Sequence, residues 1–173
     1  NVLQDLKKQI ISNPEVNNVL ILRYKYILAV VYMEFGDVEQ GRKILTDLIA
    51  IDKTFTPAYL SLAFSYFIQE KMKIAEFIVR KGLSQNPDEP GFYNILGLLE
   101  QKKNNLILAK NYFDKALSLQ KTYVPSLVNR ANISIINGEL EAAQSDLKKA
   151  IMYSPLNIDA YVSLSICQKK LGL

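Results

Sequence analysis

The sequence predicts an all-α fold built from a stack of antiparallel helix pairs. Three observations support this prediction. Small and large residues recur with a period of 34 along the 173-residue chain. Within each period the apolar residues follow the i, i+3, i+4 spacing of a helix. Seven Gly and six Pro are also too few for a fold rich in strands and tight turns.

The period is defined by residues of similar size at equivalent positions. Small residues form two series, Ala29, Ala63, Gly97, Ala131 and Ser165, and then Gly41, Ala75, Ala109 and Ala143. Large residues form two more, Tyr59, Tyr93, Leu127 and Tyr161, and then Leu45, Val79, Phe113 and Leu147. Small residues let two helices approach closely, and large residues fill the space beside them. Two short helices cannot bury their apolar stripes alone, so several pairs must stack.

A further series marks the points where one helix stops and the chain reverses. It consists of Gly36, Glu70, Asn104, Gly138 and Gly172. A helix that ends in a left-handed cap reverses in this way, and Gly and Asn adopt that conformation most readily. Glu70 lacks this ease, so we expect its turn to be strained or built differently.

The same spacing resembles the tetratricopeptide repeat, a family of paired helices. The residues that carry the resemblance are Tyr59, Leu62, Ala63, Tyr66, Ala75, Val79 and Pro87 in one period, and Tyr93, Leu96, Gly97, Ala109, Phe113 and Ala116 in the next. The resemblance implies one right-handed α-solenoid over residues 1–173. Its repeats are expected at about 22–55, 56–89, 90–123 and 124–157, with a final helix or cap at 158–173.

Both ends of the chain depart from the pattern. Residues 1–21 are expected to hold the second helix of a preceding repeat, over 1–13, and the start of the next helix at Asn13-Pro14. That next helix would run from about Pro14 to Phe35, so we expect the first hairpin to be irregular. Because the chain begins with Asn1 and stops after a turn at Gly172, we expect it to be a trimmed piece whose helices continue.

Composition argues against catalysis. The chain has no His and one Cys, Cys167, and it lacks a Gly-rich phosphate loop, so we expect no enzyme activity, no cofactor and no metal site. The apolar stretch from Val19 to Met33 is too short to cross a membrane and is interrupted by charges. The sequence names no compartment, and of the alternatives we favour the cytoplasm.

The net charge of +4 is mild for a nucleic-acid-binding protein. Lys81, Lys115 and Lys149 recur in register and would suit nucleic acid or an anionic membrane. Acidic residues lie between them, however, and the resemblance places them on the solvated side of the second helices. We therefore expect no nucleic-acid partner.

Two charged residues interrupt the repeat pattern. Glu100 and Arg130 stand where the family has Tyr and Leu, at positions that the resemblance brings close together on neighbouring first helices. We interpret them as a partly buried structural ion pair, with a polar contact for a ligand as the alternative.

The resemblance also suggests where a partner would bind, because first helices line the concave face of such a solenoid. The predicted groove residues are unusually apolar: Tyr26, Val30, Met33, Leu60, Phe64, Phe67, Ile68, Asn94, Leu98, Val128, Asn132 and Ile135. Family members that grip acidic chaperone tails have Lys, Arg and Asn there, so that role is disfavoured.

The sequence therefore predicts a non-catalytic scaffold or adaptor whose groove takes an apolar peptide or amphipathic helix, as in bacterial secretion, pilus or envelope assembly. The alternative is a self-assembling scaffold, a homo-oligomer that fills the same groove with another copy. A third possibility weighed against both is that neighbouring helices simply cover these residues.

Overall fold

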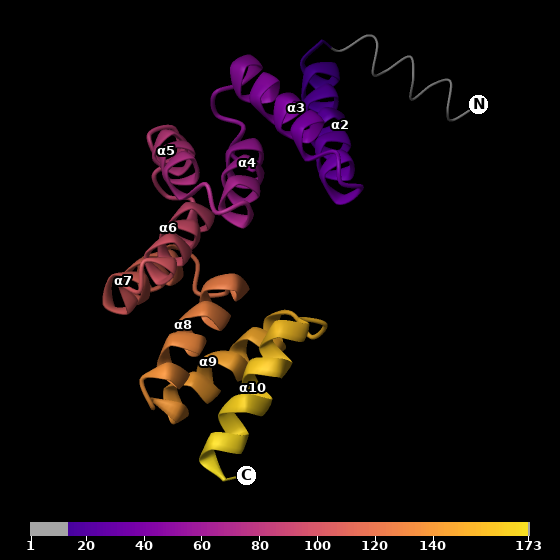
Figure 1. Cartoon of the computed structure of the whole chain (residues 1–173). Helices are drawn as coiled ribbons and strands as arrows, with labels where there is room; N and C mark the ends of the chain where they lie inside the picture. Colours follow the sequence, from indigo (N-terminus) through magenta and orange to yellow (C-terminus); the bar gives the residue numbers. More distant parts are fainter. Residues whose placement is uncertain (1–13, 173) are drawn as a thin grey trace, which may run out of the picture. The chain divides into compact units, whose positions relative to one another are not determined.

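The structure, a computed structural model, describes residues 14–172 (Figure 1). The helix expected within residues 1–13 lies outside this range. The described residues are all-α, with no strand, as the sequence predicts. The helices are α2 Pro14–Glu34, α3 Val38–Ile51, α4 Thr56–Ile68, α5 Met72–Leu83, α6 Pro90–Lys102, α7 Leu106–Leu119, α8 Val124–Ile136, α9 Leu140–Tyr153 and α10 Ile158–Leu171.

The chain divides into two compact units, residues 1–71 and 72–173, and each is described by itself. In the first unit α2 packs against α3, and α3 packs against α4. In the second unit each helix from α5 to α10 packs against the next, and α10 also contacts α8. The helix predicted to start at Pro14 is confirmed: α2 has 21 residues, against 12 to 14 in the other helices.

The predicted reversals are confirmed at the backbone level. Gly36, Glu70, Asn104 and Gly138 have φ angles of +92°, +57°, +62° and +79°. Each is followed by a residue whose N–H returns to a carbonyl five residues earlier, as when Lys71 donates to Tyr66 over 3.0 Å and Asn105 donates to Glu100 over 2.9 Å. This is the Schellman closure of a helix end. Glu70 therefore forms the same left-handed turn as the glycines.

The cores rest on close approaches between helices. In the second unit a Cβ added to Gly97 would overlap the Phe113 ring, and one added to Gly82 would overlap the Phe92 ring. Phe92 and Phe113 are fully buried. Cys167 is buried as well, and its thiol donates to the Leu140 carbonyl over 3.2 Å. The small residues thus allow an aromatic ring of a neighbouring helix to lie directly on the backbone.

The predicted ion pair between Glu100 and Arg130 is wrong. Arg130 of α8 donates Nε and Nη2 to the two carboxylate oxygens of Asp146 in α9, over 2.7 and 2.8 Å, and Nη1 to Asp114 in α7 over 2.7 Å. These hydrogen bonds raise the pKa of Arg130. Glu100 instead accepts hydrogen bonds from Lys103 and Asn105, beside its own turn. Both interactions are structural, and they join different partners from those expected.

Candidate functional site: an apolar groove between α2 and α4

The groove lies within the first unit and encloses about 530 Å³. Its apolar lining comes from three helices: Val30 and Met33 of α2, Val38 of α3, and Phe64 and Ile68 of α4. Glu34, Ser61, Ser65 and Gln69 complete it. Such a mixture of apolar walls and a few polar groups is typical of surfaces that bind other molecules.

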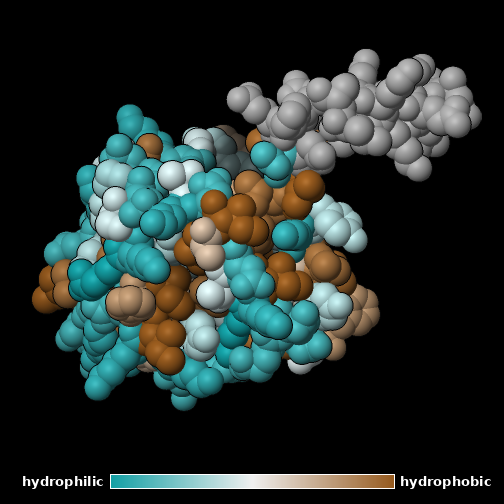
Figure 2. All heavy atoms as spheres, turned by 90° about the horizontal axis from the view of Figure 1, so that it is seen from above, coloured by the Kyte–Doolittle hydropathy of each residue, from teal (hydrophilic) through white to brown (hydrophobic). Residues whose placement is uncertain are grey.

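Two apolar residues of α4, Phe64 and Ile68, define one wall of the groove. Tyr59, Leu62 and Ala63 are buried and form the packing face of this helix. On another face Phe64 is 45% exposed and Ile68 is 65% exposed. The Phe64 ring stacks on Phe67, with centroids 5.9 Å apart and planes inclined by 19°. The half-buried Phe67 thus supports the exposed Phe64 ring. Figure 2 shows that hydrophobic residues lie among hydrophilic ones on the face that it draws.

Tyr26 ties α2 to α4 one helical turn before Val30. Its hydroxyl lies 3.0 Å from the Ser61 hydroxyl, within hydrogen-bonding distance. Its ring also meets the edge of Phe55, with centroids 5.8 Å apart. These two contacts fix the spacing of the two helices that form the walls of the groove.

Arg42 of α3 fixes the polar part of the lining. Its side chain is buried, and it donates to the Ser65 hydroxyl over 3.0 Å, to the Ser65 carbonyl over 2.8 Å and to Gln69 Oε1 over 2.8 Å. The guanidinium also lies 3.9 Å from the centroid of the Tyr66 ring. Its carboxylate partner, Glu39, is an exposed residue 2.9 Å away. Arg42 therefore fixes the positions of Ser65 and Gln69 through hydrogen bonds from α3. Its positive charge interacts with several acceptors and with the Tyr66 ring.

The twelve predicted groove residues fall into both units. All seven from α2 and α4 belong to the first unit, where Val30, Met33, Phe64 and Ile68 line the groove. Tyr26 and Phe67 contact residues of the groove, and Leu60 is half-buried on α4. Five further residues, Asn94, Leu98, Val128, Asn132 and Ile135, lie in the second unit and are considered separately.

Three of those five are corrected by the structure, because they are packed rather than open to a partner. Val128 and Ile135 are 6% and 7% exposed and belong to a core cluster that includes Ala160 and Cys167 of α10. Asn94 is 7% exposed, and its Oδ1 accepts hydrogen bonds from Ser126 and Asn129 of α8, each over 3.0 Å. Neighbouring helices cover these positions, which the periodicity alone does not reveal.

The other two residues of the second unit are partly covered. Leu98 packs against the cluster of Ala109, Phe113 and Ile133, and Asn132 is half-buried. Sequence reasoning also missed groove residues. The groove also contains Glu34, Val38 and Gln69, which lie at helix ends. Each is within two residues of Gly36 or Glu70, so closeness to a predicted turn could have identified them.

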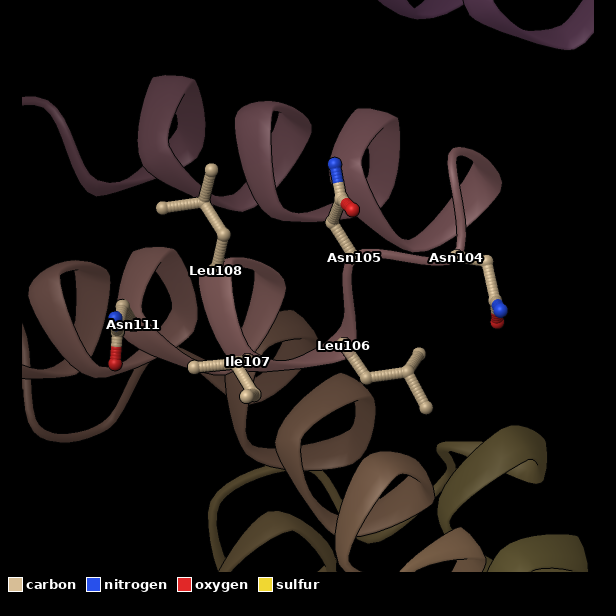
Figure 3. Close-up of a pocket in the computed structure, with 6 residues that line it drawn as sticks. All are labelled: Asn104, Asn105, Leu106, Ile107, Leu108 and Asn111. Carbon is tan, nitrogen blue, oxygen red and sulfur yellow. The ribbon is translucent and has the colours of Figure 1, made fainter.

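A second hollow, of about 650 Å³, lies at the start of α7 and is lined by Asn104, Asn105, Leu106, Ile107, Leu108 and Asn111 (Figure 3). The labelled side chains diverge: Leu108 and Asn105 point to one side, and Asn104 and Leu106 point away from them. Because its polar groups do not converge on one point, we assign this hollow no binding role.

Within residues 14–172 no group of His, Cys, Asp and Glu is arranged to hold a metal ion. In the same range no helix combines the length and the apolar character needed to span a membrane.

The left-handed turns and the antiparallel helix pairs place this chain in the class of helical-repeat proteins. The tetratricopeptide repeat family model matches residues 90–123 and 124–155. Residues 90–155 thus carry two repeats of this family, and the described helices share the fold of solved tetratricopeptide-repeat proteins. Tetratricopeptide-repeat proteins are typically non-catalytic modules that bind peptides and proteins.

Known proteins of similar sequence or structure are consistent with this assignment. Over 91% of its length the chain is 26% identical to a homologue of the BBSome complex member BBS4 from Drosophila melanogaster, of which it covers 32%. PilW, described as a widely conserved type IV pilus biogenesis factor, has 26% sequence identity to this chain. Its crystal structure gives a TM-score of 0.72 and matches 88% of this chain and 70% of PilW. A thermophilic repeat protein from Thermus thermophilus shares the fold, with a TM-score of 0.73 over 94% of this chain and 87% of that protein at 18% identity. The chain spans about a third or less of the curated relatives it matches.

Proposed function

We propose that the chain is a non-catalytic scaffold that binds an apolar peptide, or the apolar face of an amphipathic helix, in the groove between α2 and α4. The observation that supports this proposal is the apolar lining of the groove, in which the exposed Phe64 and Ile68 of α4 lie with Val30 and Met33 of α2. An amphipathic helix would place residues at i, i+3, i+4 and i+7 along such a wall.

The size of the apolar surface sets the expected affinity. Burying one large apolar side chain contributes about 1.5–3 kcal/mol, and ordering a peptide opposes part of that gain. Three or four such contacts would give a dissociation constant in the micromolar range, which corresponds to a binding free energy of about −8 kcal/mol. Glu34, Ser61 and Gln69 at the groove supply the polar contacts that would orient the ligand.

The first prediction concerns two exposed residues of this wall. Phe64→Asp and Ile68→Asp are each expected to weaken binding of a fluorescent amphipathic model helix at least about tenfold, because a carboxylate would be desolvated in the complex. Fluorescence anisotropy measures the affinity, with a scrambled peptide of the same composition as reference.

The matched control is Ile107→Asp, which alters an 84% exposed apolar residue outside the groove and is expected to leave binding unchanged. Circular dichroism melts show whether each variant folds. Equal binding by the wild-type protein and both groove variants would contradict the proposal, as would unfolding of both variants.

For the biological setting we propose assembly of bacterial cell-envelope structures such as pili. The support is the likeness to PilW. The same anisotropy assay, run with apolar segments of pilus-assembly proteins, tests this setting. If those segments do not bind where the model helix does, the setting is excluded.

The alternative is self-assembly through the groove. In light scattering it would appear as a molar mass that rises with concentration, and Phe64→Asp would abolish that rise.

A further inference from the structure

A second apolar surface lies on α2, on the side that faces away from α3. Ala29, on the α3 side of this helix, is fully buried. Opposite it, Leu20, Tyr24, Ile27 and Val31 are 40%, 67%, 60% and 44% exposed. Their spacing of i, i+4, i+7 and i+11 places them in one stripe along about 17 Å of helix. A solvated helix face is normally polar, so this stripe indicates a contact surface.

The apolar side chains of the stripe do not line the groove, although Glu34 on the flank of the stripe does. At 3.6 residues per turn, Val31 projects about 100° away from Val30, which lines the groove. A partner on the stripe and a peptide in the groove would therefore meet different apolar residues of α2 and would share Glu34.

Two exposed charges lie along one flank of the stripe. Arg23 stands toward its beginning and Glu34 toward its end, and both are exposed. They are eleven residues apart, which is close to three full turns, so they project within about 20° of the same direction. One flank of α2 thus carries a positive charge toward one end and a negative charge at the other.

We propose that this stripe is the interface between two copies of the chain, with α2 of one copy antiparallel to α2 of the other about a two-fold axis. Such an axis brings the same flank of both helices together. Placing Arg23 of each copy opposite Glu34 of the other sets the axis close to Leu28 and Ala29. The contact then contains two identical ion pairs. In a parallel pair the two-fold axis runs along the helices and places this flank of the two copies on opposite sides of the contact, so Arg23 and Glu34 would not meet.

The same register also fits together the apolar side chains from Tyr24 to Val31, whereas Leu20 lies beyond the end of the partner's α2. With the axis near Leu28 and Ala29, Val31 of the second copy falls between the levels of Tyr24 and Ile27. Ile27 of the second copy falls between the levels of Ile27 and Val31. Interleaving of this kind is the knobs-into-holes packing of paired helices. Charge and the apolar side chains from Tyr24 to Val31 therefore fit the same arrangement, in which a second copy of this chain covers this part of the stripe.

Sedimentation velocity on the 173-residue chain tests the proposal. We expect the mass to rise from 19.6 kDa to about twice that value as the concentration increases through the micromolar range. Ile27→Asp should weaken dimerisation at least about tenfold, since it places a charge at the centre of the stripe. Arg23→Glu and Glu34→Arg should each weaken it by roughly fivefold, and the double variant should restore it, because the ion pairs are then reversed.

Two controls separate this interface from other surfaces. Lys43→Glu changes an exposed charge on α3 and should leave the dimer unchanged. Phe64→Asp should also leave it unchanged, so a failure of peptide binding in the groove and a failure of dimerisation are distinguishable. If Ile27→Asp fails to fold by circular dichroism, the three charge variants decide the question.

Four outcomes would overturn the proposal. They are a chain that stays monomeric throughout, a dimer that tolerates both Ile27→Asp and Arg23→Glu, a dimer lost in Phe64→Asp, and a double charge variant that remains monomeric. The last outcome would show that Arg23 and Glu34 do not face each other across the two-fold axis.

Discussion

Gly97 and Gly36 are small for different physical reasons. A Cβ at Gly97 would overlap the Phe113 ring, whereas a Cβ at Gly36 would meet nothing within 4 Å but would occupy a backbone with φ of +92°. Alanine at Gly97 is therefore expected to destabilise through packing, by about 1–3 kcal/mol. Alanine at Gly36 is expected to destabilise through backbone strain, by about 1–2 kcal/mol.

A second substitution separates the two mechanisms. In a Phe113→Leu background, Gly97→Ala should lose most of its effect, because the ring that it strikes is gone. Gly36→Ala should keep its full effect in the same background. Urea unfolding of the three single and two double variants measures both couplings, and equal coupling for the two glycines would contradict this explanation.

Glu100 gives the fold a pH dependence. Its carboxylate accepts hydrogen bonds from Lys103 Nζ and Asn105 Nδ2, each over 2.8 Å, and the bond from Lys103 makes the largest contribution to lowering the pKa of Glu100. A carboxyl whose pKa is lowered on folding stabilises the folded state above its unfolded pKa of about 4.5. That contribution is lost as the pH falls through the folded value.

We therefore expect Glu100→Gln to be less stable than the wild type at neutral pH and to lose less further stability between about pH 5 and pH 3. Thermal melts across this range measure the difference. Glu141→Gln removes an exposed carboxylate at the start of α9 and serves as the reference variant. A Glu100→Gln variant with the same pH dependence as the wild type would show that these hydrogen bonds do not stabilise the turn.

At the scale of helices, Arg130 joins α8 to both of its neighbours. It bonds to both oxygens of Asp146, whose side chain is 9% exposed, and it also reaches Asp114. Arg130→Leu would leave Asp146 as a nearly buried carboxylate without its partner. We expect this change to lower the free energy of unfolding by about 2–4 kcal/mol.

The double variant Arg130→Leu with Asp146→Leu should recover most of that loss, because it removes the buried charge together with its partner. Arg80→Leu breaks the exposed pair with Glu76 and should change stability by less than about 1 kcal/mol. Denaturant unfolding measures all three variants. If the single variant Arg130→Leu has the same free energy of unfolding as the double variant, the unpaired Asp146 carboxylate does not destabilise the fold.

At the scale of the whole chain, most of the fold could be predicted from the sequence because the repeat expresses itself through side-chain size. The series of small residues placed the close approaches, and the series of Gly36, Glu70, Asn104 and Gly138 placed the turns. The long first helix could be predicted from Asn13-Pro14, since Pro favours the first position of a helix.

The candidate site could be predicted less completely. The periodicity says which side of a helix a residue occupies, but whether another helix covers that side depends on the three-dimensional stack. Phe64 and Ile68 remain exposed, whereas Val128 and Ile135 are packed in a cluster that includes residues of α10. The partner of Arg130 could not be predicted from the first helices alone, because Asp146 lies on the second helix α9. Asp146, a carboxylate three residues from Ala143 on a buried stripe, was the available signal.

The contact of Gly82 with Phe92 bears on how such a chain can be re-engineered. Gly82 belongs to the repeat expected at 56–89 and Phe92 to the one at 90–123, whereas Gly97 and Phe113 lie within one repeat. A cut between residues 89 and 90 would therefore separate a ring from the backbone it covers. The helix that carries Gly82 must therefore be transferred together with the following helix, which supplies the Phe92 ring. A 34-residue block cut at residue 89 would lack this ring. Grafts joined within a hairpin, at the left-handed turns, would keep the Gly82–Phe92 contact intact.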